Sequence, residues 1–236
     1  MTDQNQKIIE LSAQDQKQDA ALTEFPSPID FDFQNQSSDV KIEKIAEHFE
    51  AIMKILGLDM TDSSLQKTPH RVARMYVNEV FSGLNPSTFP DIQLLDEKCT
   101  DPEHGEIILT KARFVSFCEH HFVPMVGEVY VGYIPNGKLV GLSKISRIVK
   151  YFSSRPQLQE RLTAQIAASL STVLETEHVA VTINAQHFCV LARGVRDESG
   201  STTTSFLKGL FKTNQDFRKE FYNSVERMMH KKNIIE

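Results

Sequence analysis

Apolar residues recur at helical spacing in the first patterned stretch of the chain. They lie on one side of a predicted helix from about Val40 to Leu56, and the glycine that follows is a natural C-terminal stop. A second helix is predicted to begin at Thr68–Pro69, a capping residue with proline in the first turn, and to stop near Gly83. These patterns predict an N-terminal helical pair within residues 39–100.

Alternating apolar residues then replace the helical spacing and predict strands. The strand segments share a period of two and turn-forming boundaries: 105–142, 179–183, 187–195 and 202–211. Helical spacing returns from Lys144 to Phe152 with Ser143 as N-cap, in a helix opened by Pro156, and over 217–229. Because helices lie between and after the strands, without an internal repeat, the order predicts an α+β fold. Residues 101–236 would form an antiparallel sheet with packed helices.

The first 38 residues have a different composition. They are polar, rich in Gln, Asp and Ser, and interrupted by Phe25-Pro26-Ser27-Pro28, so residues 1–38 are predicted to form a disordered arm. A plain tail is the simpler interpretation of this arm, and a regulatory role is a hypothesis. A length of 236 residues suffices for one sizeable core with such an arm attached.

Composition narrows the class of protein. No apolar run approaches the length of a membrane span and the first residues lack the apolar segment of a signal peptide, so a cytoplasmic protein without membrane contact is expected. Three cysteines, an odd number, fit a reducing compartment and a metal site better than a disulfide framework. A formal net charge of -5 argues against a nucleic-acid surface, so a polyanionic small ligand would need locally clustered Lys and Arg.

Thiol and imidazole side chains are concentrated in two segments, Cys118-Glu119-His120-His121 and His187-Phe188-Cys189. Cys118 and His121 are spaced to grip one metal ion from a single turn, and Cys189 adds a third ligand from a predicted distant strand. Thiolate and imidazole ligands suit zinc, and three protein ligands leave a fourth position for water, as in catalytic zinc sites. The two remaining imidazoles, His120 and His187, are suited to moving protons beside the metal.

Two other interpretations of these residues stay open. A buried Cys is often a small hydrophobe, and a lone His is often a satisfied core residue. A structural zinc would need a fourth protein ligand, which His120 or His187 could supply. Cys99 lies in a polar stretch that is predicted to be a loop, so its thiol is interpreted as incidental.

Basic residues form pairs that suit an anion. Lys144 and Arg147 follow Ser143 at the start of one predicted helix, and the helix carrying Arg71 and Arg74 repeats the spacing. On either segment alone, a solvated basic face is the simpler interpretation. Two further cations, Arg193 and Arg196, lie on the strand predicted to carry Cys189. The last candidate is the Glu160 carboxylate in the first turns of a predicted helix. The favourable interaction of a carboxylate with the helix dipole is sufficient to explain its position there.

Five motifs in this chain resemble those of GTP cyclohydrolase I, in the order of that family. They are Cys118–Pro124, Gly141–Val149, Arg155–Thr163, His187–Gly194 and Gly209–Phe211. The resemblance runs from about Ile42 to the C-terminus and leaves the first 38 residues outside. It implies an enzyme that converts GTP and water into 7,8-dihydroneopterin triphosphate and formate, the entry to folate and other pterins.

The resemblance also implies roles for individual residues. Cys118, His121 and Cys189 would be the ligands of a zinc ion in each subunit. His187 would protonate the imidazole ring nitrogen of guanine, and His120 would act as acid and base in ring opening, formate release and ribose rearrangement, which Ser143 assists. Glu160, aided by Gln159, would hold the guanine edge. The triphosphate would be bound by a basic set, Lys144, Arg147, Arg193, and Arg71 and Arg74 from a neighbouring subunit.

The implied fold is a tunnelling fold (T-fold) whose sheets join edge to edge into a toroidal homodecamer. Such joining would also remove the open edges of a small sheet. This chain departs from the family at Phe206 and Lys208, where small or hydroxyl residues are usual, and the expected effect is on packing.

Three rivals compete with this interpretation. Pterin synthases bind zinc with three His, which the Cys118 and Cys189 pattern contradicts, and the nitrile reductases of queuosine synthesis use a Cys nucleophile without this metal set. A non-catalytic oligomer that binds GTP or a pterin and keeps a structural zinc would have a damaged acid/base set. Here His120, His187 and Ser143 are all present.

Overall fold

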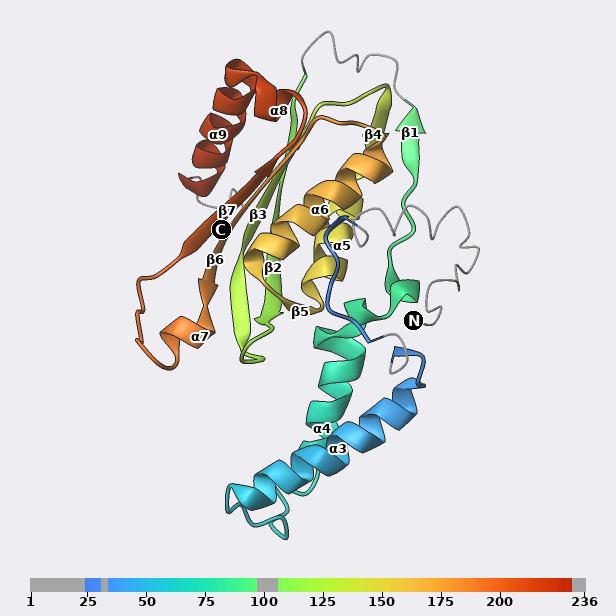
Figure 1. Ribbon diagram of the computed structural model, residues 1–236, viewed down its shortest axis with the longest axis vertical. Helices are drawn as coiled ribbons and strands as arrows, with labels where there is room; N and C mark the ends of the chain where they lie inside the picture. The colour runs from blue at the N-terminus through green and yellow to red at the C-terminus, as the bar shows by residue number, and fades with distance from the viewer. Residues whose placement is uncertain (1–23, 31–33, 97–105, 231–236) are drawn as a thin grey trace, which may run out of the picture.

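The computed structural model of the chain describes residues 24–30, 34–96 and 106–230 (Figure 1). Two expectations from the sequence fall wholly or mostly outside these ranges: the arm over residues 1–38 and the loop around Cys99. In the described part, no helix is both long and apolar enough to cross a membrane.

Within the described residues, five strands form the main sheet in the order β5-β2-β3-β6-β7. Their bounds are β2 Ile108–Cys118, β3 Pro124–Tyr133, β5 Pro156–Gln157, β6 Val179–His187 and β7 Thr202–Leu207. The pairs β2–β3, β3–β6 and β6–β7 are antiparallel, whereas the short β5 runs parallel to its neighbour β2. A separate antiparallel pair joins β1 (Leu94–Asp96) to β4 (Lys138–Val140). The predicted α+β class is therefore confirmed.

Helices cover both faces of this sheet, as Figure 1 shows. The helices α5 (Leu142–Ser153) and α6 (Gln159–Leu174) pack on one face over the larger core, and α8 (Leu210–Thr213) and α9 (Gln215–His230) pack on the other. Alternation along β3 explains the division, since Val129 and Val131 belong to the first core and Tyr130 to the second. Because helices cover both faces of the sheet, polar functional residues are left to the ends of the strands.

The N-terminal helices lie beyond one end of the sheet (Figure 1). Helix α3 spans Ser38–Ile55, and the side chain of Ser37 caps it by accepting from the backbone of Val40. Helix α4 spans Thr68–Met75 and packs on α3 through small buried residues, Ala46 and Ala73. A π turn (Tyr76–Val80) and two 3-10 turns (Ser82–Leu84 and Pro86–Thr88) lead from α4 to the sheet.

Two predicted helix starts were wrong. Helix α5 begins at Leu142 with Gly141 as N-cap, so Ser143 lies inside the first turn and makes no capping hydrogen bond. Pro156 does not open a helix but begins β5, because residues 156 and 157 pair with Phe117 and Cys118 of β2. Helix α6 starts three residues later, and Glu160 remains in its first turn, as predicted.

The strand boundaries after residue 179 differ from the predicted ones. The segments 179–183 and 187–195 are predicted as separate strands, but a single strand, β6, continues to His187. Residues Phe188–Leu191 then form the short helix α7. Cys189 therefore lies on a helix, and Arg193 and Arg196 follow it in a non-strand segment. The last strand stops at Leu207, because Gly209 adopts a φ of 59° and turns the chain into α8.

Part of the arm predicted to be disordered packs on the body of the protein. The main-chain oxygen of Phe25 and the hydroxyl of Ser27 both accept hydrogen bonds from Gln165 of α6. The ring of Phe25 meets Phe206 edge-on at 5.5 Å. Lys208, the other position expected to affect packing, donates to the Ser171 hydroxyl and forms an ion pair with Glu177.

Candidate metal centre and adjoining cavity

A tight turn between β2 and β3 places Cys118 and His121 on the same side. Cys118 ends β2, its amide donates to the oxygen of Val123, and its own oxygen accepts from the amide of Phe122. Phe122 closes the turn with a φ of 51°, a left-handed conformation unusual for a residue with a side chain. This geometry brings the Cys118 sulfur to 3.7 Å from Nδ1 of His121.

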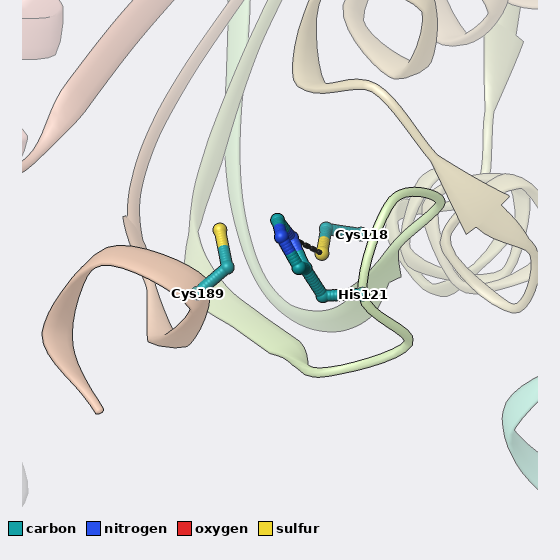
Figure 2. A group of neighbouring side chains, drawn as sticks. All are labelled: Cys118, His121 and Cys189. Atoms are coloured by element: carbon teal, nitrogen blue, oxygen red, sulfur yellow. Dashed lines mark hydrogen bonds between the residues drawn. The ribbon is translucent and has the colours of Figure 1, made fainter. Parts of the chain in front are cut away.

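Cys189 reaches the same point from α7. Residue 187 pairs with Met125 at the start of β3, so the end of β6 and the helix that follows lie beside the 118–121 turn. The ligand atoms of Cys118, His121 and Cys189 all lie within 4.8 Å of one another, and their side chains point toward a common centre (Figure 2). The three residues therefore lie together, as the sequence predicted.

The electrostatics of this group favour a cation. Burial and the neighbouring Cys118 thiol raise the pKa of Cys189, while Arg193 acts in the opposite direction. Two thiols this close resist ionising together, and a bound divalent ion removes that conflict. The donor set of two sulfurs and one imidazole nitrogen matches a zinc site with one open position.

The imidazole of His187 is held by a buried amide. Its Nε2 donates to Oε1 of Gln159 at 2.7 Å. The Gln159 nitrogen faces the main-chain oxygens of Ile183 (3.2 Å) and Thr202 (2.9 Å), which can only accept, so the amide oxygen must face the histidine. Burial lowers the pKa of His187, and the nearby Glu160 carboxylate opposes this shift. His187 is thus oriented with Nδ1 as its remaining ring nitrogen.

A cavity of about 440 Å³ adjoins Cys118, His121 and Cys189, which we call the metal-ligating group because its donor atoms could hold a metal ion. Its walls combine predicted site residues with the 197–202 segment that precedes β7: Cys118, His120, Gln157, Leu158, Gln159, Glu160, His187, Cys189, Val190, Asp197, Gly200, Ser201 and Thr202. Six of the residues proposed from the sequence therefore line one cavity. Two thiols, two imidazoles and two carboxylates there suit proton transfer to a polar ring.

The predicted phosphate-binding residues are more dispersed. Arg193 donates to Nε2 of His121 at 2.8 Å and so lies at the metal-ligating group. Ser143, Lys144 and Arg147 on α5 are not among the residues lining the cavity, and Lys144 donates to the main-chain oxygen of Asp91. Arg71 and Arg74, exposed on α4, are also absent from that lining.

Sequence reasoning missed an ion pair beside this centre. Arg161 on α6 holds Glu119 with both nitrogens, at 2.5 Å and 3.4 Å, and each side chain is only about one-fifth exposed. The pair links the 118–121 turn to the first turn of α6. Its signal was present in the sequence, since Glu119 lies inside the Cys-His motif and Arg161 follows Glu160, but only folding brings them together.

Gln157 was also missed. It lines the cavity, pairs with Cys118 across β5 and β2, and accepts the amide of Glu119 on its main-chain oxygen at 3.1 Å. Its side chain donates to Gln165 and to the oxygen of Phe152. A buried glutamine between Pro156 and Leu158 gave no sequence pattern that would distinguish it from a surface residue.

Comparison with known proteins identifies similar sequences across most of the chain. Residues 45–226 match the sequence profile described as GTP cyclohydrolase I. GTP cyclohydrolase 1 of Aeromonas salmonicida is 53% identical over 186 residues, which cover 79% of this chain and 84% of that protein. The enzyme of the same name from Erwinia tasmaniensis is 49% identical over 199 residues, covering 84% and 89%. That of Vibrio campbellii is 49% identical over 191 residues, covering 81% and 87%.

Among solved structures, the chain has a weak likeness to the archaeosine synthase QueF-Like in its apo form. The TM-score is 0.38 with 19% identity, covering 44% of this chain and 93% of that one.

Proposed function

The chain belongs to the GTP cyclohydrolase I family and is an enzyme of that type, acting on GTP, and we propose that its catalytic centre is the cavity beside Cys118, His121 and Cys189. The reaction of this enzyme opens the imidazole ring of guanine, releases formate and closes 7,8-dihydroneopterin triphosphate. The observation that carries the assignment is that two members of the Cys-His-Cys group, Cys118 and Cys189, line the same cavity as His187 and Glu160.

Zinc is the metal that this donor set suits best. When bound, it supplies Lewis acidity that lowers the pKa of a water molecule toward neutrality. Cys118, His121 and Cys189 would hold it, and Arg193 next to His121 adds positive charge beside the two thiols. The electrostatic conflict between the thiols supports a resident cation of this kind.

His187 is the proposed proton donor to the guanine ring nitrogen. Because Nε2 is engaged by Gln159, Nδ1 is the atom left to exchange a proton with substrate. The polar contacts of Gln159 all lie within the protein, which favours an orienting role for it and leaves the guanine edge to the Glu160 carboxylate. His120, exposed in the same cavity, is proposed as the second acid and base for ring opening and ribose rearrangement.

The remaining proposed residues point to a site shared between subunits. Ser143 would assist the ribose rearrangement, with Lys144, Arg147, Arg193, Arg71 and Arg74 binding the triphosphate. Since the cavity within one chain is lined by neither α5 nor α4, residues of those helices from a neighbouring copy would complete it. This arrangement agrees with the proposed toroidal homodecamer.

We also propose a tunnelling fold for this chain, and its open sheet edges support the homodecameric assembly. Strand β7 is an edge of the described sheet, and β2 is covered on its outer side only at its end by the two residues of β5. Exposed backbone donors and acceptors on such edges are satisfied when sheets of neighbouring subunits join. We further propose the division into an N-terminal arm (1–38), a helical region (39–100) and a catalytic domain (101–236), and a cytoplasmic location, where GTP is supplied.

Incubation of the zinc-loaded protein with GTP tests the function directly. Formate and the dihydropterin chromophore are expected in equal amounts, because one ring opening yields one of each. A zinc-loaded protein that binds GTP tightly without releasing formate would contradict the proposal. Cys189→Ser serves as the matched control, since it removes a single sulfur from the metal-ligating group.

A further inference from the structure

A short segment outside the matched family region lies against the helix that carries Glu160. Residues Phe25–Ser27, here called the strap, precede the matched range 45–226 and run beside α6 in Figure 1. The Phe25 ring packs against Phe206 of β7 and against the larger core. The strap therefore spans α6 and β7 rather than extending into solvent.

Buried polar side chains receive the strap. Gln165 is fully buried, and its amide nitrogen donates to the Phe25 oxygen at 2.7 Å and to the Ser27 hydroxyl at 3.0 Å. Arg155, 1% exposed, donates to the same hydroxyl at 3.3 Å and to the oxygen of Gly83 at 2.7 Å. Without the strap, both Gln165 donors would lose the partners they have here, which is costly for a buried amide. The body is built to hold this segment.

The same glutamine leads to the metal-ligating turn. Gln165 accepts a hydrogen bond from the Gln157 side chain at 2.9 Å. The backbone of Gln157 in turn pairs with Cys118 and accepts the amide of Glu119. An unbroken series of contacts thus runs from the strap through two buried amides to the end of β2.

The strap also forms a wall next to the proposed substrate site. A second cavity, of about 650 Å³, is lined by Glu24, Phe25 and Pro26 on one side and by α6 and β7 residues on the other. It shares Leu158 and Glu160 with the cavity at the metal-ligating group. Displacement of the strap would open this wall and loosen the support of β5 together.

We propose that the strap positions β5, and through Gln165 and Gln157 holds the Cys118 end of β2 in its metal-binding geometry. Gln165 and Gln157 are positioning residues in this arrangement, because they act through the backbone of Cys118 and Glu119. The inference rests on the proposed metal centre. It makes the geometry of that centre depend on residues that precede the matched family region.

Zinc release tests the coupling in the full-length protein. The double variant Phe25→Ala/Ser27→Ala removes the ring contact and the shared hydroxyl while leaving every residue of α6 and β5 unchanged. Zinc transfer to a chromophoric chelator is expected to be a few-fold faster than in wild type, less than the order of tenfold typical of a direct partner of a metal ligand. Gln165→Met, which removes both donors to the strap, should release zinc at least as fast.

A matched control separates coupling from lost stability. Phe217→Ala also removes a partly buried ring, but from the core under α9, far in sequence from the contact series. It is expected to lower the melting temperature without changing zinc release below that temperature. Equal zinc-release rates for the strap variants and wild type would overturn the proposal, as would equal acceleration by Phe217→Ala.

Hydrogen exchange of the metal-free protein supplies an independent readout. The amides of Gln157 and Glu119 should exchange faster in Phe25→Ala/Ser27→Ala than in wild type. Unchanged exchange at both amides would contradict the coupling. A wild-type protein that takes up no zinc would instead refute the metal centre of the proposed function. The exchange data would then still decide whether the strap holds β5.

Discussion

At the scale of single residues, the proposed roles distinguish metal ligands from residues that carry protons. Cys189→Ser is expected to lose both zinc and turnover, because it removes one of the thiols that lie within 4.8 Å of the other ligand atoms. His120→Ala should keep zinc and lose turnover, since His120 lines the cavity without belonging to that group. Metal analysis and formate release on both variants check this, and full zinc occupancy in Cys189→Ser would contradict the ligand assignment.

The Glu119–Arg161 pair makes a second prediction at this scale. Glu119→Gln keeps the shape of the side chain but removes its charge, so the turn carrying Cys118 and His121 is held less firmly against α6. A loss in kcat/KM on the order of tenfold is expected, because small displacements of a reacting group are costly.

The matched control for this pair is Glu198→Gln, which changes an exposed carboxylate on the segment before β7. Steady-state kinetics of the two variants should differ clearly, with Glu198→Gln close to wild type. Indistinguishable kinetics for Glu119→Gln and wild type would show that the pair does not position the turn.

At the scale of elements, Gly209 decides where the last strand ends. Its φ of 59° suits glycine, and an added Cβ would lie 2.2 Å from Nδ1 of His178 and 2.4 Å from the oxygen of Glu177. Gly209→Ala should lower the free energy of unfolding by more than the roughly 1–3 kcal/mol that backbone strain alone costs. Gly137→Ala is the control, since Gly137 has a φ of 69° but nothing within 4 Å of an added Cβ.

Urea denaturation of both glycine variants measures this difference. Gly137→Ala reports backbone strain alone, and Gly209→Ala reports strain plus the clash with the 177–178 segment. Equal losses in the free energy of unfolding would mean that the chain around His178 shifts without cost.

The Glu128 carboxylate on β3, which pairs with Lys111 of β2, makes the free energy of unfolding depend on pH. Burial alone would raise the pKa of Glu128, but hydrogen bonds from Lys111 and Tyr130 outweigh it, so the pKa lies below its ordinary value of 4.5. A depressed carboxyl pKa stabilises the fold above the unfolded-state value, and this contribution is lost as pH falls through the folded-state pKa. The free energy of unfolding should therefore decline below about pH 4.5.

Glu128→Gln tests the source of this decline. The variant should be less stable than wild type at neutral pH, and the difference should shrink toward zero in acid as wild-type Glu128 becomes protonated. Denaturation at several pH values measures it, and a pH-independent difference would point to packing rather than charge.

At the scale of the whole molecule, the proposal that subunits share a site predicts complementation. Cys189→Ser and Arg74→Ala should each be nearly inactive alone, the first through the proposed metal centre and the second through the proposed phosphate contact from a neighbouring subunit. Co-assembled in equal amounts, they should regain about a quarter of wild-type activity, because random pairing gives that fraction of sites with both residues intact. A mixture that stays inactive would place both residues in one chain's site.

Assembly state is the control for this experiment. Light scattering on each variant and on the mixture establishes that subunits have exchanged. Cys189→Ser mixed with His121→Ala should regain nothing, since both residues belong to the metal-ligating group of a single chain.

Local sequence patterns predicted most elements and failed where long-range pairing decided the outcome. Pro156 carries the signal of a helix start, yet backbone pairing with Phe117 recruits it into β5. His187 to Val195 has apolar residues at strand spacing, yet the chain leaves the sheet after His187 and forms α7, which turns Cys189 toward Cys118. At Pro156 a contact distant in sequence outweighed the local preference.

The amino-acid sequence was sufficient to indicate the chemistry proposed for this protein. The Cys-His motif and the partner cysteine offer donor atoms that favour zinc, and the two neighbouring histidines are residue types suited to proton transfer. The sequence also determined the α+β class, because apolar periodicity specifies which side of each element is buried. How these residues are held could be seen only once the chain was folded. The Gln159–His187 hydrogen bond, the Glu119–Arg161 pair and the docking of Phe25 on Phe206 join segments separated along the chain, and no local pattern encodes such contacts.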